Sequence, residues 1–330
     1  MSTLYPIKFK PVLKEAIWGG SALHEKFGKE SRPGHLIGES WEVNGMSGES
    51  SVVANGFLKG NTLEEIIEIY MGDMVGDGPY EKYGNEFPLL IKFIDAHETL
   101  SIQVHPDDQL AYDRHHAWGK TEMWYIIDAA AEALIYTGFK NKTTKEEYLR
   151  YLDNKTLGDL INTTIVRPGD SFFIPAGMVH AIGAGVMLTE IQQTSDITYR
   201  IYDWDRVDAT GKPREMHTEL ALDAINFDLN DTGLIRHEPL LNHPVTLAEC
   251  KYFRTNLLQI DCPIIKDYSL TDSFIIYICT KGMVLVECFG NTEKIHAGET
   301  ILIPSSSDSV TLIPAGTATL LEVFIPEKTK

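Results

Sequence analysis

The chain has 330 residues, of which 43% are hydrophobic and 23% charged, a composition that predicts a folded protein with a large core in one or two domains. Its formal net charge is −18, from 47 acidic and 29 basic side chains. With no lysine or arginine run, we expect no nucleic-acid partner and no membrane partner, and an anionic ligand would need a locally positive pocket.

The ends of the chain and its cysteines indicate the compartment. Residues 1–10 lack the apolar centre of a secretory signal, and no apolar run approaches the roughly 18 residues that span a bilayer. The four cysteines lie in the last third without CxxC spacing, so we interpret them as buried strand residues with reduced thiols: Cys250, Cys262, Cys279 and Cys288. These features predict a cytoplasmic protein.

Helical patterns occur in only three segments. Residues 61–72 begin with a capping box from Thr62 to Glu65 and continue with apolar residues at helical spacing. Residues 144–162 repeat the capping pattern, and residues 215–227 are rich in alanine and leucine.

The rest of the chain alternates short apolar runs with Gly, Pro, Asn and Asp, which is typical of strands and turns. Many short strands with few helices favour a β-sandwich or jelly roll over an alternating α/β fold. The predicted strands include Leu89–Ile94, Leu100–His105, Met123–Asp128, Ala133–Thr137, Ser171–Ile174, Phe274–Thr280, Val284–Cys288, Thr300–Ile303 and Thr319–Phe324.

An internal repeat predicts two related β-barrels. Residues 168–176 and 297–305 share the order small residue, Gly, acid, any residue, two apolar residues, Ile, Pro and small residue. A polar, turn-rich stretch from Asn230 to Pro244 separates them. We therefore expect a metal-binding catalytic domain over residues 1–236 and a C-terminal domain over residues 237–330.

The two repeats differ where chemistry would lie. Five residues beyond Pro175 comes His180, whereas five residues beyond Pro304 comes Ser309. We expect the first barrel to hold the active site and the second barrel to be metal-free.

A candidate metal site begins in residues 100–106. A strand period of two puts Ser101, Gln103 and His105 on one face and apolar residues on the other. Together with Glu122 and His180, the amide and the imidazole form a mixed nitrogen and oxygen set that suits one Zn²⁺ ion with an open position. Taken alone, a residue of this kind more often has an ordinary hydrogen-bonded role than a metal-binding one.

The motifs around these residues resemble type I mannose-6-phosphate isomerase in its short bacterial form. The resemblance covers Leu100–Asp107, Gly119–Tyr125, Pro168–Ala181 and Leu188–Arg206, and also Trp18–Gly20 and Lys212–Glu215. It implies an all-β fold of two cupin-type jelly-roll barrels with a small α-helical insertion.

The resemblance also implies residue roles. Gln103, His105, Glu122 and His180 match the metal ligands, and Arg200 matches an arginine proposed to act in catalysis. The remaining matches are an acid beside the site, a lysine two positions before the ligand glutamate, and a residue at the phosphate end of the substrate: Glu190, Lys120 and Ser101. Where longer relatives carry an acid before the Trp-Gly pair, this chain has Ile17.

The implied reaction interconverts mannose 6-phosphate and fructose 6-phosphate through a cis-enediol, with one Zn²⁺ ion per chain. We hypothesise that Lys120 and Arg200 supply positive charge and, with Ser101, bind the phosphorylated hexose, while Glu190 transfers the proton. Lys120 is open to two roles, as a phosphate ligand or as the base. Both cations could also be solvated surface charges.

Two other functions are compatible with the ligand pattern. Cupin barrels with His and Glu ligands also host metal-dependent dioxygenases, and the domain could be a non-catalytic sugar-binding cupin. For the oligomeric state we expect a monomer or a weak homo-oligomer.

Overall fold

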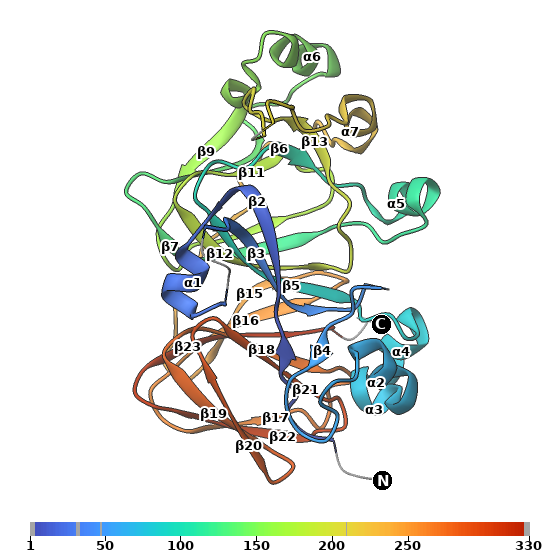
Figure 1. The fold of residues 1–330 in the computed structure, drawn as a ribbon, viewed down its shortest axis with the longest axis vertical. Coiled ribbons are helices and arrows are strands. Elements are labelled where there is room, and N and C mark those ends of the chain that lie inside the picture. The colour runs from blue at the N-terminus through green and yellow to red at the C-terminus, as the bar shows by residue number, and fades with distance from the viewer. Residues whose placement is uncertain (1–3, 31–33, 47, 209, 327–330) are drawn as a thin grey trace.

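The computed structural model describes residues 4–30, 34–46, 48–208 and 210–326. Figure 1 shows the sheets following one another along the long axis, with the helices at the edges and at one end. The helices are α1 (Ala22–Phe27), α2 (Leu63–Tyr70), α3 (Gly72–Val75), α4 (Asp77–Tyr83), α5 (Asp108–His115), α6 (Lys145–Asp153), the 3₁₀ helix η1 (Leu157–Leu160) and α7 (Thr218–Ala224).

Two sheets form the first barrel. One has the strand order β14-β10-β7-β12-β5-β3-β2 and the other β13-β6-β11-β8-β9. Their strands are β2 (Val12–Gly20), β3 (Ile37–Asn44), β5 (Leu89–Ala96), β6 (Ile102–Val104), β7 (Glu122–Ala129), β8 (Leu134–Phe139), β9 (Ile161–Ile165), β10 (Ser171–Ile174), β11 (His180–Ile182), β12 (Val186–Gln193), β13 (Tyr199–Tyr202) and β14 (Leu234–Ile235).

The second barrel has sheets in the orders β15-β16-β23-β18-β21 and β17-β22-β19-β20, and a separate short pair joins β1 to β4. These strands are β15 (Pro244–Glu249), β16 (Arg254–Ile260), β17 (Ile264–Asp267), β18 (Ile275–Lys281), β19 (Met283–Cys288), β20 (Asn291–His296), β21 (Glu299–Ile303), β22 (Ser309–Pro314) and β23 (Ala318–Phe324), with β1 (Phe9–Lys10) and β4 (Val52–Val53).

The pairing order confirms that the two barrels are related. Strands β5 to β12 pair as β5-β12-β7-β10 and β6-β11-β8-β9, and strands β16 to β23 pair as β16-β23-β18-β21 and β17-β22-β19-β20. Each strand of the first set therefore has a counterpart in the second, from β5 and β16 through to β12 and β23. The sequence repeat falls on the counterparts β10 and β21, each preceded by a glycine at positive φ, Gly169 and Gly298.

The cores follow from the strand period of two. In β7, Met123 and Tyr125 face the second barrel, whereas Trp124 and Ile126 face the interior of the first. In β18, Ile276 belongs to the same shared core as Met123, and its neighbours point into the second barrel. One apolar cluster thus joins residues from both halves of the chain.

The predicted division after residue 236 falls between β14 and β15, and the division into two domains stays a prediction. The N-terminal segment does not respect that division. The backbone of Ile7 pairs with Leu302 of the second barrel through two hydrogen bonds of 2.8 and 2.9 Å.

The three predicted helical segments are confirmed as α2, as α6 with η1, and as α7. The capping box forms at Thr62 and Glu65, and Thr144 accepts a hydrogen bond from the backbone of Glu147. Sequence patterns missed α1, α3, α4 and α5, which are short or have no apolar stripe. The helices therefore occur at several separate places.

Among the described residues, no helix combines the length and the apolar character needed to cross a bilayer. All four cysteines are unpaired. The expectation that all are buried strand residues is wrong for Cys250, which is half-buried and follows the end of β15, and for Cys262, which is exposed. Cys262 lies in the turn between β16 and β17.

Candidate metal centre

The centre begins with one row of residues across the sheet that contains β6. Gln103 in β6 lies opposite His180 of β11 on one side and opposite Arg200 of β13 on the other. Directly opposed residues of antiparallel strands point to the same face. Pairing alone therefore directs these three side chains to one side of the sheet.

The facing sheet contributes a second row. Glu190 of β12 lies opposite Trp124 of β7 and opposite Lys92 of β5, and Lys92 lies opposite Trp41 of β3. Glu122 begins β7, two residues before Trp124, and therefore shares its face. The two sheets thus present polar residues to the same interior.

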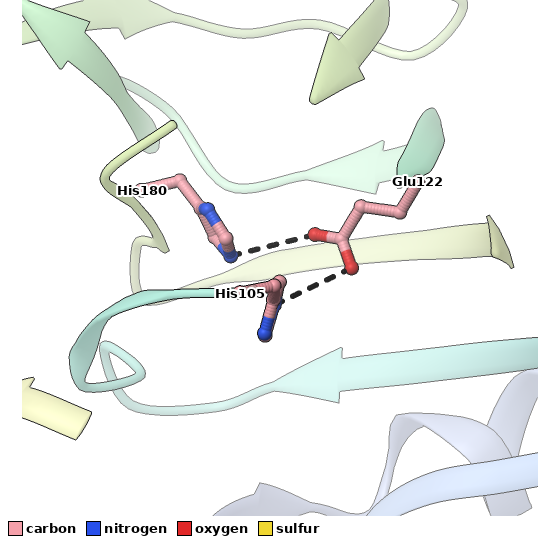
Figure 2. Close-up of side chains that lie close together, drawn as sticks. All are labelled: His105, Glu122 and His180. Carbon is pink, nitrogen blue, oxygen red and sulfur yellow. Dashed lines mark ion pairs between the residues drawn. The ribbon is translucent and has the colours of Figure 1, made fainter. Parts of the chain in front are cut away.

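Three predicted metal ligands meet between the sheets. The Nε2 atom of His180 lies 3.4 Å from one carboxylate oxygen of Glu122, and the Nε2 atom of His105 lies 3.6 Å from the other. Figure 2 shows the Glu122 carboxylate directed toward both imidazoles. Their ligand atoms all lie within 4.8 Å of one another, and the three side chains are buried.

The polar atoms of this trio fit a bound cation. The Nδ1 atoms of His105 and His180 lie 2.9 and 2.8 Å from the carbonyl oxygens of Ile197 and Met178. A carbonyl accepts only, so each Nδ1 carries the proton and each Nε2 keeps its lone pair. The Nε2 atom of His105 and both carboxylate oxygens of Glu122 are buried without a hydrogen-bond partner. Buried polar atoms without partners are rare, and a metal ion would satisfy them.

Gln103 lies at the edge of the trio. Its side-chain nitrogen is 3.3 Å from the Nε2 atom of His180. Rotation of the amide by half a turn would present its oxygen to the same space. Gln103 is therefore placed to add a neutral oxygen ligand.

Burial sets the protonation of the imidazoles. Burial, together with the Lys120 charge and the neighbouring His180, holds the pKa of His105 well below its usual value. Burial lowers the pKa of His180 to about 4. Both rings are neutral at pH 7, which is the form that binds a metal.

Glu190 is held by two donors. Its carboxylate lies 3.3 Å from the Nζ atom of Lys92 and accepts a 2.9 Å hydrogen bond from Nε1 of Trp124. Burial raises the pKa of Glu190, but Lys92, Lys120 and the Trp124 hydrogen bond outweigh it and leave the pKa below its usual value. Glu190 is therefore ionised at neutral pH. Lys120 lies 3.4 Å from Glu122.

A cavity of about 310 Å³ opens beside these groups. Five of the predicted site residues line it, namely Ser101, Gln103, Lys120, Glu190 and Arg200. The three remaining predicted residues, His105, Glu122 and His180, are buried and connect to the cavity wall through Gln103 and Lys120. The structure thus brings together all eight.

The cavity is also lined by residues to which the sequence analysis assigned no role. They include Glu39, Trp41, Lys92, Asp196 and Arg214. Lys92 had a visible signal, because it is the only charged residue in the first six positions of the apolar strand β5 and lysine is rarely buried unless it is paired. Ile17 packs against the apolar cluster around Trp18 and does not line the cavity.

Among the residues that the structure describes, the second barrel carries no equivalent ligand set. Ile174 and Ile303 are equivalent residues of the sequence repeat. Ile174 pairs with Glu122 and Ile303 pairs with Ile275, so Ile275 takes the position of Glu122. Val310 lies opposite Lys266 as His180 lies opposite Gln103. The residue that replaces His180 is therefore Val310, which is buried, and not Ser309, which is exposed and was reached by counting from the proline.

Several known proteins are similar to this chain over two thirds or more of its length. Residues 7–139 match the family described as "Phosphomannose isomerase type I, catalytic domain". The chain is 42% identical to mannose-6-phosphate isomerase ManA of Bacillus subtilis over 257 residues, covering 76% of this chain and 78% of that protein. It is 38% identical over 226 residues to mannose-6-phosphate isomerase of Streptococcus mutans, covering 67% and 68%.

A solved structure extends the likeness over nearly the whole length. The crystal structure of mannose 6-phosphate isomerase from Bacillus subtilis is 32% identical, with a TM-score of 0.83, and the match covers 97% of this chain and 99% of that one. The cupin fold expected from the motifs is thereby confirmed.

Proposed function

Because the chain belongs to the type I mannose-6-phosphate isomerase family, we propose that it interconverts mannose 6-phosphate and fructose 6-phosphate through a cis-enediol. The observation that carries this proposal is one cavity lined by three carboxylates, two arginines and two lysines beside a trio that can hold a metal ion. An aldose–ketose isomerisation needs a base, a cationic environment for the developing negative charge, and a binding site for the phosphate.

We assign the metal to His105, His180, Glu122 and Gln103. Two imidazoles, one carboxylate and one amide oxygen suit Zn²⁺, and the neutral amide leaves more positive charge on the ion than a second carboxylate would. When bound, the ion supplies a positive charge beside the sugar oxygens that become negative as the C2 proton leaves.

Glu190 is the residue that we assign to proton transfer. Its pKa is depressed despite burial, because Lys92 and Lys120 lie close to it, so it is ionised and able to accept a proton at neutral pH. Trp124 and Lys92 hold the carboxylate on the cavity wall. The same group can then return the proton to the neighbouring carbon of the enediol.

Lys120 fits a charge-stabilising role better than a phosphate ligand. Its Nζ atom lies 3.4 Å from a carboxylate oxygen of Glu122, which is one of the residues assigned to the metal. The phosphate is better matched by Arg200 and Arg214, with Ser101, because guanidinium groups bind phosphate oxygens through paired donors. The cavity of about 310 Å³ is at the small end of ligand pockets and suits a monosaccharide phosphate.

A coupled isomerase assay across several sugar phosphates tests this function. We expect turnover of mannose 6-phosphate that is abolished by a chelator and restored by Zn²⁺, with little turnover of pentose phosphates. Consumption of oxygen in place of isomerisation would identify a dioxygenase. Binding of the sugar phosphate without turnover in the metal-loaded protein would reject the enzyme assignment.

A further inference from the structure

We propose that Asp203 is a positioning residue that fixes the guanidinium of Arg214 for binding the phosphate group of the substrate. This inference rests on the proposed function, because it concerns the phosphate end of the same cavity. Asp203 itself is outside the cavity lining and only 1% exposed, whereas Arg214 lines the cavity.

The contact between the two side chains is a bidentate ion pair. The Nε and Nη2 atoms of Arg214 donate to the two carboxylate oxygens of Asp203 at 2.8 and 2.6 Å. This pairing uses one edge of the planar guanidinium and fixes its plane. The described residues offer Arg214 no other hydrogen-bond partner, so Nη1 and the second proton of Nη2 remain available to a ligand.

Arg206 completes the support. Its Nη2 atom donates at 2.6 Å to the Asp203 oxygen that also accepts from Nη2 of Arg214. Its Nη1 atom lies 3.5 Å from a carboxylate oxygen of Glu98. Burial raises the pKa of Asp203, but the hydrogen bonds from Arg214 and Arg206 reverse this and lower it. Asp203 therefore stays ionised, and the cluster of Asp203, Arg206 and Arg214 keeps a net positive charge in a chain with a net charge of −18.

Arg200 is held in a different way. Its Nη1 atom donates to the backbone carbonyl of Glu215 at 2.9 Å, and its backbone nitrogen lies 3.1 Å from Nδ1 of His217. Removing the Asp203 carboxylate would therefore release Arg214 and leave the anchors of Arg200 in place. An arginine that must be ordered by the ligand binds more weakly than one already ordered.

The experiment is a calorimetric titration of the zinc-loaded protein with inorganic phosphate, which needs no turnover. We expect Asp203→Asn to weaken the dissociation constant by about tenfold, and Arg214→Ala to weaken it at least as much. Because Asp203 acts through Arg214, adding Asp203→Asn to Arg214→Ala should cause no further loss. An unchanged affinity in Asp203→Asn, or the same tenfold loss in both backgrounds, would overturn the proposal.

Two further variants separate positioning from a folding defect. Asp205, two positions after Asp203, has an exposed carboxylate that pairs with Lys155. Asp205→Asn removes this carboxylate and should leave phosphate affinity unchanged. Arg214→Lys keeps Asp203 and the charge but loses the paired donors, and should bind phosphate several-fold more weakly. A folding defect would also lower zinc content, which we expect to stay near one ion per chain in every variant.

The kinetic readout distinguishes this inference from the proposed function. Asp203→Asn should raise KM for mannose 6-phosphate about tenfold with a much smaller change in kcat. If wild-type protein binds phosphate through Arg214 but does not isomerise the sugar, the proposed function fails and the positioning role stands.

Discussion

The Nζ atom of Lys92 lies 3.3 Å from a carboxylate oxygen of Glu190, on neighbouring strands of the first barrel. Lys92 also lies 3.4 Å from Glu39, so one buried ammonium group stands between two carboxylates. The nearby opposite charges raise the pKa of Lys92 in spite of its burial, which keeps it charged.

Replacing Lys92 should therefore change the pH dependence of activity. Burial raises the pKa of Glu190 and Lys92 counteracts it, so Lys92→Met should raise that pKa and move the acid limb of the kcat/KM profile to higher pH. We expect a loss of about 10- to 100-fold at pH 7, partly recovered as the pH rises. Lys92→Arg is the matched control, and an unmoved acid limb in Lys92→Met would contradict the assignment of Glu190.

Arg200→Ala should reduce kcat by at least about 100-fold, the usual effect of losing one donor that stabilises developing charge. Metal analysis should still find close to one zinc ion per chain, because Arg200 contacts a backbone carbonyl and not the ligand trio. Arg150→Ala, at an exposed position of helix α6, serves as the control. Activity within a few-fold of wild type would remove Arg200 from the catalytic group.

Loss of a ligand should release the metal. His180→Ala should weaken zinc affinity by more than about 100-fold, since even residues that only orient a ligand change it by 10- to 100-fold. His115→Ala is a suitable comparison, because His115 hydrogen-bonds Tyr199 and lies outside the trio. Competition with a chromophoric chelator measures both affinities. Equal zinc affinity in the two variants would show that His180 is not a ligand.

The second barrel allows a stability prediction. Lys266 lies 2.9 Å from the buried carboxylate of Glu322, and Glu322 lies opposite Tyr277 as Glu190 lies opposite Trp124. Lys266→Met leaves that carboxylate without its cation, and breaking such a pair costs roughly 3–5 kcal/mol. Urea unfolding should show this loss while zinc content is unchanged. A change below about 1 kcal/mol would mean that the hydrogen bonds from Asn256 and Tyr268 satisfy the Glu322 carboxylate without the lysine.

Strand periodicity predicted much of the fold, because short apolar runs bounded by turn residues leave few alternatives. The same periodicity placed Gln103 and His105 together, and the repeat identified two related barrels. The approach of Glu122 to His180 could not be read from the chain alone. It depends on two sheets folding over each other, which sequence spacing does not encode.

The phosphate end of the cavity was harder to predict. Asp203 directly follows β13, whereas Arg214 lies in a segment without a strand pattern. Their pairing depends on the return of the chain to β13, where His217 contacts Arg200. Lys92 was detectable as a charge in an apolar strand, yet only the register of β5, β12 and β7 shows that it meets Glu190. Local patterns identify which residues are unusual, and long-range pairing decides which of them meet.

The pairing of Ile7 with Leu302 bears on how the two halves come apart. Ile7 pairs with Leu302 of the second barrel, and one apolar cluster includes both barrels. A protease that cuts the connection between β14 and β15 should therefore leave a nicked but associated protein. The fragments should separate only in denaturant, and neither half should be soluble when produced alone.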